Sequence, residues 1–482
     1  MMDKKPFYIT TTLPYVNAEP HIGHAMEFIR ADAIARRKKL AGFDVFFNTG
    51  TDEHGVKIYQ KAKQASMETQ AFVDQNAAKF KEMLKLLGVM PEINFVRTTD
   101  AHHVAAAQEF WKLVDKNGFI YKKDYSVKYC VGCELDKTDS ELVNGRCPLH
   151  PLQELEIIQE ENYFFKWGAF QAKLLALYEN RPDFVVPDFR FNEIKAFVAR
   201  GLEDFSISRL KAKMPWGISV PGDDSQVMYV WFDALVNYIS AVGWPDHKGD
   251  FEKWWVRSGG VVQYCGKDNL RQQSAMWQAM LMAAGLPPSR TIIINGFVTG
   301  EGGVKMSKSL GNTVNPLEVV KEYGTEAMRY HVARELSPFE DSPFTMEGFK
   351  AAYNAGLANG LGNLVSRVMK MAQDNLAAPV GVPPSDAFPK DYDEAFDSYN
   401  IQTASNIIWR HISEADQIIQ SKQPFKLIKT DKAAAQEIIR DLVIRVHSVA
   451  GMLEPIMPET SKVIKELVRT NKMPAAPLFV RK

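Results

Sequence analysis

The stretch that decides the fold covers residues 13–37 and reads LPYVNAEPHIGHAMEFIRADAIARR. Before it, the alternating segment FYITTT at residues 7–12 predicts a β-strand. From Pro20 onward the pattern is helical, and Gly42 marks the expected end of the helix. The next segment, FDVFF, predicts a second strand. A strand, a helix and a strand of this length form the unit of a parallel, doubly wound sheet, so we predict an α/β, Rossmann-like fold.

Two histidines, His21 and His24, lie three residues apart where the extended segment gives way to the helix. Such a pair could hold a metal, act as acid and base, or bind the phosphates of a ligand. Gly23 leaves room for a flat ligand, and Pro20 suits a helix start. The amides of a helix N-terminus bind phosphate readily, and imidazoles would add N–H donors. From these residues alone, a phosphate site and two ordinary histidines at a helix start are both open.

Length and composition limit the class of protein. With 482 residues, two to four domains are expected. The apolar content of 46% and charged content of 24% are typical of globular proteins, and no apolar run is long enough to predict a membrane span. The start, MMDKK followed by a strand pattern, leaves no room for a signal peptide, which favours the cytoplasm. Because 58 basic residues balance 58 acidic ones, contact with nucleic acid must depend on local basic patches.

Changes of pattern divide the chain into five expected parts. From about Phe119 the sequence turns to short polar strands, and alternation returns at VMYVWFDALVNYI and GGVVQYCGKDNL. We therefore expect one sheet that is split by an insertion, followed by a helical region with apolar stripes. One such stripe consists of Leu357, Leu361, Leu364, Val368 and Met371. The parts are the catalytic sheet's first half (1–117), a connective insertion (118–226), the sheet's second half (227–292), a lysine-loop region (293–350) and a helical domain (351–482).

A cysteine cluster lies in the insertion, in YCVGCELDKTDSELVNGRCPLH. Cys130 and Cys133 form one pair, and Cys147 and His150 form a second pair after 13 intervening residues. Cys3His at this spacing is a closed tetrahedral ligand set for Zn²⁺. Because no ligand position stays open, we expect a structural zinc that replaces a core the insertion cannot build. The fourth cysteine, Cys265, is expected to be a buried apolar side chain, so no disulfide framework is predicted.

A lysine-bearing motif, KMSKS, follows at residues 305–309 in a glycine-rich loop after a predicted strand. A basic loop alone is usually only solvated. Together with HIGH, in this order and each after a strand of one sheet, it resembles the two signature sequences of class I aminoacyl-tRNA synthetases. The resemblance implies that the first motif binds ATP and that the second closes over its triphosphate, with Mg²⁺. The residues implied in catalysis are His21, His24, Lys305 and Lys308, and the ATP site would add Gly23 and Ser307.

The implied reaction decides among the roles of the histidine pair. An amino-acid carboxylate is already a nucleophile, and it attacks the α-phosphorus in line and expels pyrophosphate. Positioning and well-placed donors lower this barrier, so no dedicated base is needed. The closed cysteine cluster makes a second metal site at HIGH unnecessary. We therefore interpret His21 and His24 as donors to ATP.

Three further groups of residues are candidates for an amino-acid site. Asp52, at the end of the second strand, is either a counter-ion for a substrate ammonium or a helix N-cap, and we favour the counter-ion. Helical spacing places two sets of side chains each on one face, although such stripes are by default core. The sets are Trp231, Ala234, Leu235 and Tyr238, and Asn269, Gln273 and Trp277.

The resemblance narrows to the methionyl-tRNA synthetase family. LPYVNAEPHIGHA, TGTDEHG, the Cys3His cluster, YVWFDAL, GKD and KMSKSLGN occur in that family's order along nearly the whole chain. This implies that L-methionine and ATP form methionyl-adenylate, and that the methionyl group passes to the 3′ end of tRNA(Met), the initiator form included, with release of AMP and pyrophosphate. The implied methionine site comprises Leu13, Tyr15, Trp231, Ala234, Leu235 and Tyr238, with Asp52 on the ammonium and Arg209 assisting. Gly266 and Asp268 match a turn on the nucleotide side.

One departure from the family pattern concerns Asn269 and Gln273, whose positions usually carry an aliphatic residue and a histidine. The two amides could bond each other, or they could offer an N–H to the thioether sulfur. We expect methionine to stay the substrate while the tuning of the pocket changes.

The helical domain carries the candidates for reading the tRNA. Asn363 and Arg367 lie four residues apart, on the face away from the apolar stripe, and Phe425 follows a proline. Amide and guanidinium donors with an aromatic stacking face suit single-stranded loops. By the resemblance these residues recognise the CAU anticodon, with Phe425 where the family usually has a tryptophan. Because the chain ends just after this domain, we expect a monomer.

Two alternatives stay open at this point. One is a class I synthetase for another apolar amino acid, although those relatives carry a far longer editing insertion. The other is a catalytically silent tRNA-binding paralogue, which the intact histidines and lysines argue against. A small nucleotidyltransferase would not need the helical bundle.

Overall fold

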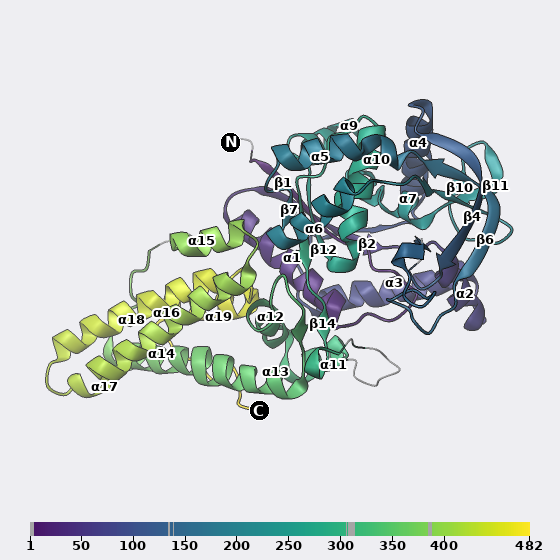
Figure 1. The fold of residues 1–482 in the computed structure, drawn as a ribbon. Helices are drawn as coiled ribbons and strands as arrows, with labels where there is room; N and C mark the ends of the chain where they lie inside the picture. Colours follow the sequence, from purple (N-terminus) through teal and green to yellow (C-terminus); the bar gives the residue numbers. More distant parts are fainter. Residues whose placement is uncertain (1–3, 134, 138, 305, 307–313, 384–387) are drawn as a thin grey trace.

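A six-stranded parallel sheet lies at the centre of the protein (Figure 1). The computed structural model describes residues 4–133, 135–137, 139–304, 306, 314–383 and 388–482. The strand order is β3-β2-β1-β12-β13-β7, and every neighbouring pair is parallel. The strands are β1 (Pro6–Thr11), β2 (Asp44–Thr51), β3 (Asn94–Arg97), β7 (Val185–Val186), β12 (Val261–Gly266) and β13 (Thr291–Asn295). This sheet confirms the predicted doubly wound α/β class.

The order of the strands creates a crevice next to β1. The chain passes from β1 to β2 and β3 on one side, and β12 and β13 are added on the other side. At such a switch point the loops after two neighbouring strands diverge, and ligands bind at the carboxyl edge. Two apolar cores cover the sheet faces. The helices of this half are α1 (Ile22–Leu40), α2 (Val56–Gln64), α3 (Thr69–Leu86), α4 (Ala101–Lys116) and α10 (Trp277–Ala283).

The insertion contains two small antiparallel sheets. One has the order β5-β4-β6-β8 and the other β10-β11-β9. Their strands are β4 (Ile120–Cys130), β5 (Leu135–Lys137), β6 (Glu156–Phe165), β8 (Phe205–Ser206), β9 (Ser208–Leu210), β10 (Ser219–Val220) and β11 (Asp223–Met228). Strand β7, between α5 (Gln171–Asn180) and α6 (Asp188–Ala199), pairs with β13 at the edge of the main sheet. The segment 118–226 therefore also completes the central sheet.

Short elements connect the insertion to β12 and β13 to the helical region. Before β12 they are α7 (Val230–Ala234), α8 (Asn237–Ser240), α9 (Lys248–Phe251) and η3 (Glu252–Val256). After β12 come η4 (Lys267–Asn269) and η5 (Gln272–Met276). Beyond β13 lie β14 (Val298–Thr299), η6 (Glu301–Gly303), α11 (Pro316–Tyr323), α12 (Thr325–Arg334) and β15 (Ser342–Pro343). The candidate residues Lys305, Ser307 and Lys308 lie outside the described residues.

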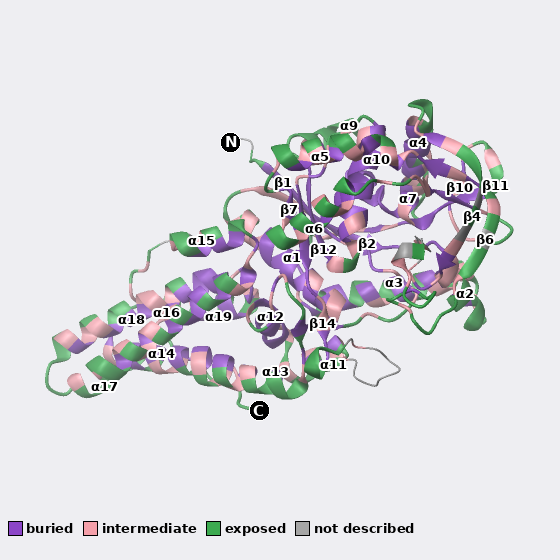
Figure 2. Ribbon diagram, in the orientation of Figure 1, coloured by how far each residue is buried: buried purple, intermediate pink, exposed green. Residues whose placement is uncertain are grey.

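The C-terminal region is a bundle of helices, as predicted, and its long helices bury one face each (Figure 2). The predicted stripe from Leu357 to Met371 is buried throughout, at 9% exposure or less. Among the described residues no helix is long and apolar enough to cross a membrane. The helices are α13 (Met346–Ala352), η8 (Tyr353–Gly362), α14 (Asn363–Asn375), α15 (Lys390–Asp397), α16 (Ile401–Lys422), α17 (Pro424–Leu427), α18 (Lys432–Leu453) and α19 (Pro458–Thr470).

A buried ion pair ties the bundle to α1. Arg329 of α12 and Asp32 of α1 are both fully buried, with Nη2 and Oδ2 separated by 2.6 Å. The same guanidinium donates from Nε to the carbonyl of Ile456 at 2.6 Å, just before α19. A buried charge pair of this kind tolerates little displacement, because separating the partners leaves an uncompensated charge. Helix α1, which carries the HIGH motif at its start, is therefore anchored to α12 and to the segment before α19.

Candidate active site and metal centre

A cavity of about 430 Å³ opens at the carboxyl edge of the sheet, between the ends of β1 and β12. Its wall comes from the segment after β1, the first turn of α1, the end of β2, the start of α7 and the turn after β12. Ten of the residues predicted for the ATP and methionine sites line it: Leu13, Tyr15, His21, Gly23, His24, Asp52, Trp231, Gly266, Asp268 and Asn269. Segments far apart in the chain thus converge at the switch point.

The two histidines form the N-terminal cap of α1. The Nδ1 atom of His21, the N-cap, accepts the backbone N–H of Gly23 at 3.2 Å. The backbone N–H of His21 in turn donates to Nδ1 of His24 at 3.2 Å. The rings stack with their centroids 3.7 Å apart and their planes at 21°. Because both Nδ1 atoms act as acceptors, the proton of each neutral ring belongs on Nε2.

Desolvation sets the protonation state of His24. Loss of water around the ring lowers its pKa well below the usual value, and the neighbouring His21 lowers it further. At neutral pH His24 is therefore uncharged and can donate through Nε2 without carrying a fixed charge. The group of metal-ligating side chains found in the described part of the chain is Cys130, Cys133, Cys147 and His150.

Two glycines of this wall lie close to polar side chains. A Cβ on Gly23 would lie 3.1 Å from Cε1 of His21, and a Cβ on Gly266 would lie 2.7 Å from Oδ1 of Asp268. Each glycine lets a neighbouring polar side chain fold back over the backbone. Gly23 thus makes space for the cap itself.

Asp52 lies beside Tyr15 in the cavity wall. Its backbone N–H donates to the carbonyl of Pro14 at 2.9 Å, and its carbonyl accepts from Val16 at 3.2 Å. Asp52 is only 6% exposed, and the N-cap of the helix that follows is Gly55, so the alternative role as N-cap does not hold. A buried carboxylate on the cavity wall is suited to a cationic group of the ligand.

Six other candidates are buried next to this wall and are not part of the cavity lining. Trp231 reaches the cavity, but Leu235, Tyr238 and Trp277 belong to the apolar core on one face of the sheet. Arg209 of β9 donates from Nη1 to Ser206 Oγ and to the carbonyl of Ser208, both at 2.8 Å. The six residues are Arg209, Ala234, Leu235, Tyr238, Gln273 and Trp277.

Of the two possibilities raised for Asn269 and Gln273, the structure does not show a bond between the two amides. The Asn269 amide donates to Oδ1 of Asp268 at 3.2 Å, and the Gln273 amide donates to the Tyr238 hydroxyl at 2.7 Å. The reason is local geometry: Asn269 ends a 3-10 turn, and Gln273 lies in the wider π turn of η5. A turn wider than 3.6 residues takes positions i and i+4 off a common face.

Glu27 is a cavity residue that sequence reasoning missed. Its Oε1 accepts the backbone N–H of Thr12 at 2.7 Å, which ties the first helix to the end of β1. Burial raises the pKa of Glu27 to about 8, and the carboxylate of Asp268 adds to the rise. The available signal was its position three residues after His24, one turn along the same helix face.

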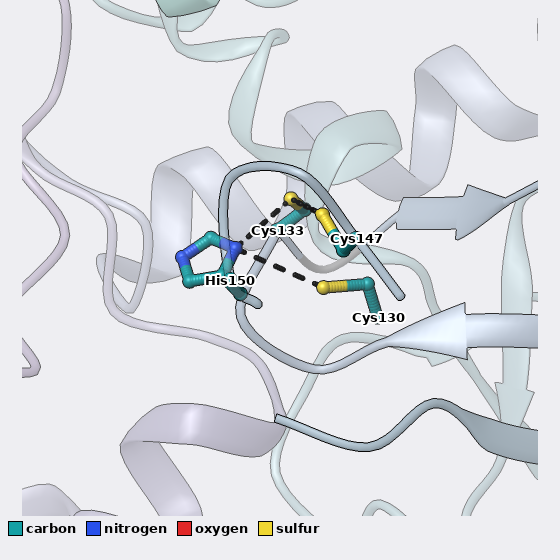
Figure 3. A group of neighbouring side chains, drawn as sticks. All are labelled: Cys130, Cys133, Cys147 and His150. Carbon is teal, nitrogen blue, oxygen red and sulfur yellow. Dashed lines mark hydrogen bonds between the residues drawn. The ribbon is translucent and has the colours of Figure 1, made fainter. Parts of the chain in front are cut away.

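The cysteine cluster has the geometry of a zinc site (Figure 3). Sγ of Cys133 lies 3.4 Å from Sγ of Cys147 and 3.2 Å from Nδ1 of His150, and Sγ of Cys130 lies 3.8 Å from that nitrogen. All four ligand atoms lie within 4.8 Å of one another. Ligands of a tetrahedral zinc, with bonds of about 2.3 Å for sulfur and about 2.0 Å for nitrogen, are separated by about 3.5–3.8 Å. The four residues can therefore hold zinc.

The cluster is also part of the cavity wall. Cys133, His150 and Gly132 line the cavity, and a Cβ on Gly132 would come within 2.4 Å of the His150 ring. Lys57 of α2 connects the two sites, because its Nζ donates to the carbonyl of Gly132 and lies 5.8 Å from the centroid of the Tyr15 ring. The metal centre and the ligand cavity are thus neighbours.

The candidates in the helical domain lie on its surface. Asn363 is exposed, and Phe425 of α17 is 47% exposed, at the end of the bundle farthest from the sheet (Figure 1). Arg367 is 37% exposed and pairs with Oδ1 of Asp416 on α16 at 3.0 Å. This ion pair, which was not predicted, fixes the direction of the guanidinium.

Comparison with known proteins agrees with this arrangement. A family model described as tRNA synthetases class I (M) matches residues 7–154 and 150–369. A methionine--tRNA ligase of Mesorhizobium japonicum is 38% identical over 97% of this chain and 92% of its own length, and one of Thermotoga maritima is 38% identical over 97% and 76%.

Solved structures support the same family assignment. A Mycobacterium tuberculosis methionyl-tRNA synthetase in complex with methionyl-adenylate matches with a TM-score of 0.87 and 36% identity, over 95% of this chain and 93% of that chain. The apo form of the synthetase from this organism matches with a TM-score of 0.83 and 31% identity, over 100% and 99%. The chain therefore belongs to the methionyl group of the class I tRNA synthetases.

Proposed function

We propose that the protein uses ATP to convert L-methionine to methionyl-adenylate and then transfers the methionyl group to the 3′ end of tRNA(Met), the initiator form included. AMP and pyrophosphate are released. The observation that carries the proposal is the cavity at the switch point, which is lined both by the histidine pair at the N-terminus of α1 and by the buried carboxylate of Asp52. The similarity to a synthetase solved with methionyl-adenylate supports the same assignment.

Hydrogen-bond donors to the phosphate oxygens of ATP would drive the first half of the reaction. A carboxylate oxygen of the amino acid forms a bond to the α-phosphorus, and the bond to the bridging oxygen of pyrophosphate breaks with its electron pair. Negative charge grows on the phosphate oxygens, so N–H groups from His21, His24 and the first amides of α1 stabilise the transition state. Gly266 and Asp268 would bound the nucleoside. Mg²⁺ would arrive with ATP, and Lys305, Ser307 and Lys308 of the KMSKS loop would bind the triphosphate.

Binding of the amino acid would depend on one negative charge and on a mostly apolar part of the cavity wall. Asp52 would pair with the α-ammonium, while Leu13, Tyr15 and Trp231 bound the side chain. Asn269 lies at the edge of this part. Behind this wall, the same proposal gives supporting roles to Arg209, Ala234, Leu235, Tyr238, Gln273 and Trp277. An aromatic wall of this kind suits an unbranched thioether.

A structural zinc completes the proposal. It would be held by Cys130, Cys133, Cys147 and His150. With four protein ligands no coordination position is open, so the zinc would cross-link the segment and would not take part in the reaction. The domain division follows from the same proposal, with residues 351–482 as the anticodon-binding part and the rest as the catalytic part and its insertions. We also propose that the enzyme works as a cytoplasmic monomer.

Charging of a tRNA(Met) transcript tests the proposal as a whole. Incubation with ATP and labelled methionine should give acid-precipitable, base-labile methionyl-tRNA, because the product is an ester. Binding of the transcript without charging would instead identify a silent tRNA-binding paralogue.

Anticodon recognition is a separate prediction. Arg367→Ala should lower the preference for the CAU anticodon over a mutated one about tenfold or more, because an oriented guanidinium contact is worth about 1–3 kcal/mol. Filter binding with the wild-type and mutated transcripts measures this ratio. Lys370→Ala, on the same helix and paired with Asp374, is the control and should keep the ratio. Equal discrimination by Arg367→Ala and the control would refute the role of Arg367.

A further inference from the structure

The carboxylate of Asp341 contacts two segments of the cavity wall from behind. Asp341 lies in the connection between α12 and β15 and is not among the described residues that line the cavity. Its Oδ2 accepts from Nζ of Lys267 at 2.7 Å, and its Oδ1 accepts from the same nitrogen at 2.8 Å. Oδ1 also accepts the backbone N–H of Phe297 at 3.0 Å. One carboxylate therefore holds a group that follows β12 and a group that follows β13.

Both contacts lead directly to the cavity. Lys267 lies between Gly266 and Asp268, two lining residues of the turn at 266–268, where the proposed function places the nucleoside. Phe297 lines the cavity itself. The two segments also touch, because Nζ of Lys267 lies 4.5 Å from the centroid of the Phe297 ring, and a Cβ on Gly266 would lie 3.8 Å from Cε1 of that ring. The carboxylate thus completes a cluster whose other members shape the cavity wall.

The backbone around Asp341 fits closely against the segment that follows β13. A Cβ on Gly296 would lie 2.1 Å from the carbonyl carbon of Glu340 and 2.5 Å from the backbone nitrogen of Asp341, so this approach requires glycine. The Ser342 N–H donates to the carbonyl of Phe297 at 2.9 Å, where β15 begins to pair with β14. The position of the carboxylate relative to Phe297 is therefore fixed by the main chain.

The connection that carries Asp341 is also anchored to the helix of the HIGH motif. Arg30 of α1 is only 1% exposed. Its Nη2 donates to the carbonyl of Leu336 at 2.8 Å and to that of Ser337 at 2.9 Å, both just after the end of α12. The Ser337 N–H in turn donates to Oγ of Ser342, the residue after Asp341, at 2.8 Å. A continuous set of contacts therefore joins α1 to the Asp341 carboxylate and through it to the turn at 266–268.

We propose that Asp341 is a positioning residue for ATP: it holds Lys267 and Phe297 so that the turn at 266–268 keeps a fixed place relative to the start of α1. This inference rests on the proposed ATP-dependent activation. Groups that are already in place when the ligand arrives need no reorganisation in the reaction. The side chains of Lys267 and Asp341 are 25% and 42% exposed, and partly exposed ion pairs add little to folding. The main effect of the pair is therefore on local geometry.

Pyrophosphate exchange by two variants of Asp341 tests the inference. Asp341→Ala removes both acceptor oxygens, and the KM for ATP should rise about tenfold, because displacing a binding group by about 1 Å can cost about 100-fold. The KM for methionine at saturating ATP should not change, a split that a general loss of structure would not produce. Asp341→Asn, which keeps an oxygen for the Phe297 N–H, should give a smaller rise.

Lys267→Met examines the ion pair separately. This variant keeps an apolar stem of similar length, and it should raise the KM for ATP about as much as Asp341→Asn does. The double variant should show no further rise, because the two substitutions remove the same contact. Effects that multiply in the double variant would mean that Lys267 binds ATP by itself, and they would contradict the inference.

Asp44→Asn is the matched control. Asp44 is also 42% exposed and pairs with Lys253 at 2.6 Å, and Nζ of Lys253 lies 4.1 Å from the centroid of the Trp254 ring. This pair lies at the start of β2, at the amino edge of the sheet, so the KM for ATP should stay at the wild-type value.

An unchanged KM for ATP in folded Asp341→Ala overturns the inference. If that variant does not fold, an unchanged KM for ATP in Asp341→Asn and Lys267→Met overturns it. Absence of methionine-dependent exchange in the wild-type protein would instead overturn the proposed function.

Discussion

Replacing His24 by alanine is expected to lower the rate of methionine-dependent pyrophosphate exchange about 100- to 1000-fold, the usual cost of losing one donor to a developing oxyanion. His24 is a neutral ring whose Nδ1 accepts the His21 N–H, so its Nε2–H is the group that alanine removes. The ring also packs edge-on against Phe80, with the centroids 5.1 Å apart, and losing this contact changes stability only modestly.

Pyrophosphate exchange by two further variants distinguishes a His24 that donates to ATP from a His24 that only supports the fold. His24→Gln, which keeps an N–H near the same place, should recover part of the lost rate. His411→Ala is the control and should exchange at the wild-type rate. His411 lies in the helical domain, with its Nδ1 3.6 Å from Oε2 of Glu414. Melting temperatures close to that of the wild type would show that all three variants fold. Near-normal exchange by His24→Ala would refute the assignment of the ATP site.

Loss of the metal is the second change with a large expected effect. Cys147→Ser should abolish stoichiometric zinc binding and open the segment from 130 to 150, because zinc supplies about 10–16 kcal/mol in isolated zinc-finger peptides. The central sheet should persist, since its two cores do not include the cluster. Exchange should nevertheless fall, because Cys133 and His150 are part of the cavity wall.

Zinc content by atomic emission and limited proteolysis of the 130–150 segment measure this effect independently of activity. Cys265→Ser is the control: Cys265 is buried on β12, outside the cluster, and the variant should keep one zinc. A Cys147→Ser protein that resists proteolysis in this segment and exchanges at the wild-type rate would contradict the account.

Some of this structure could be predicted from sequence because the signals are local. Strand, helix and strand around HIGH predicted the sheet, and paired cysteines predicted the ligand cluster. Strand β7 escaped notice, since two residues carry no period of their own and pair only through β13. Helical spacing grouped Trp231 with Tyr238 but could not tell which of them faces the cavity and which the core.

The remaining features are long-range, and pattern alone does not give them. Glu27 acquires its raised pKa from burial and from Asp268, which is distant in the chain. Gln273 lies in a π-helical turn, which has more than 3.6 residues per turn, and it donates to the Tyr238 hydroxyl. Spacing of i and i+4 on an ordinary helix therefore pairs Gln273 with Asn269, which is the wrong partner. Roles for Lys305, Ser307 and Lys308 stay predictions, since these residues lie outside the described ranges.

The most direct test of the central claim is pyrophosphate exchange by the purified wild-type protein with a panel of amino acids. Methionine should support exchange with a kcat/KM about 100-fold or more above isoleucine, leucine or valine, because a pocket shaped for an unbranched side chain discriminates by about 1–3 kcal/mol per misplaced methylene. Exchange that is fastest with one of the other three amino acids, or that none of the four supports, would contradict the account.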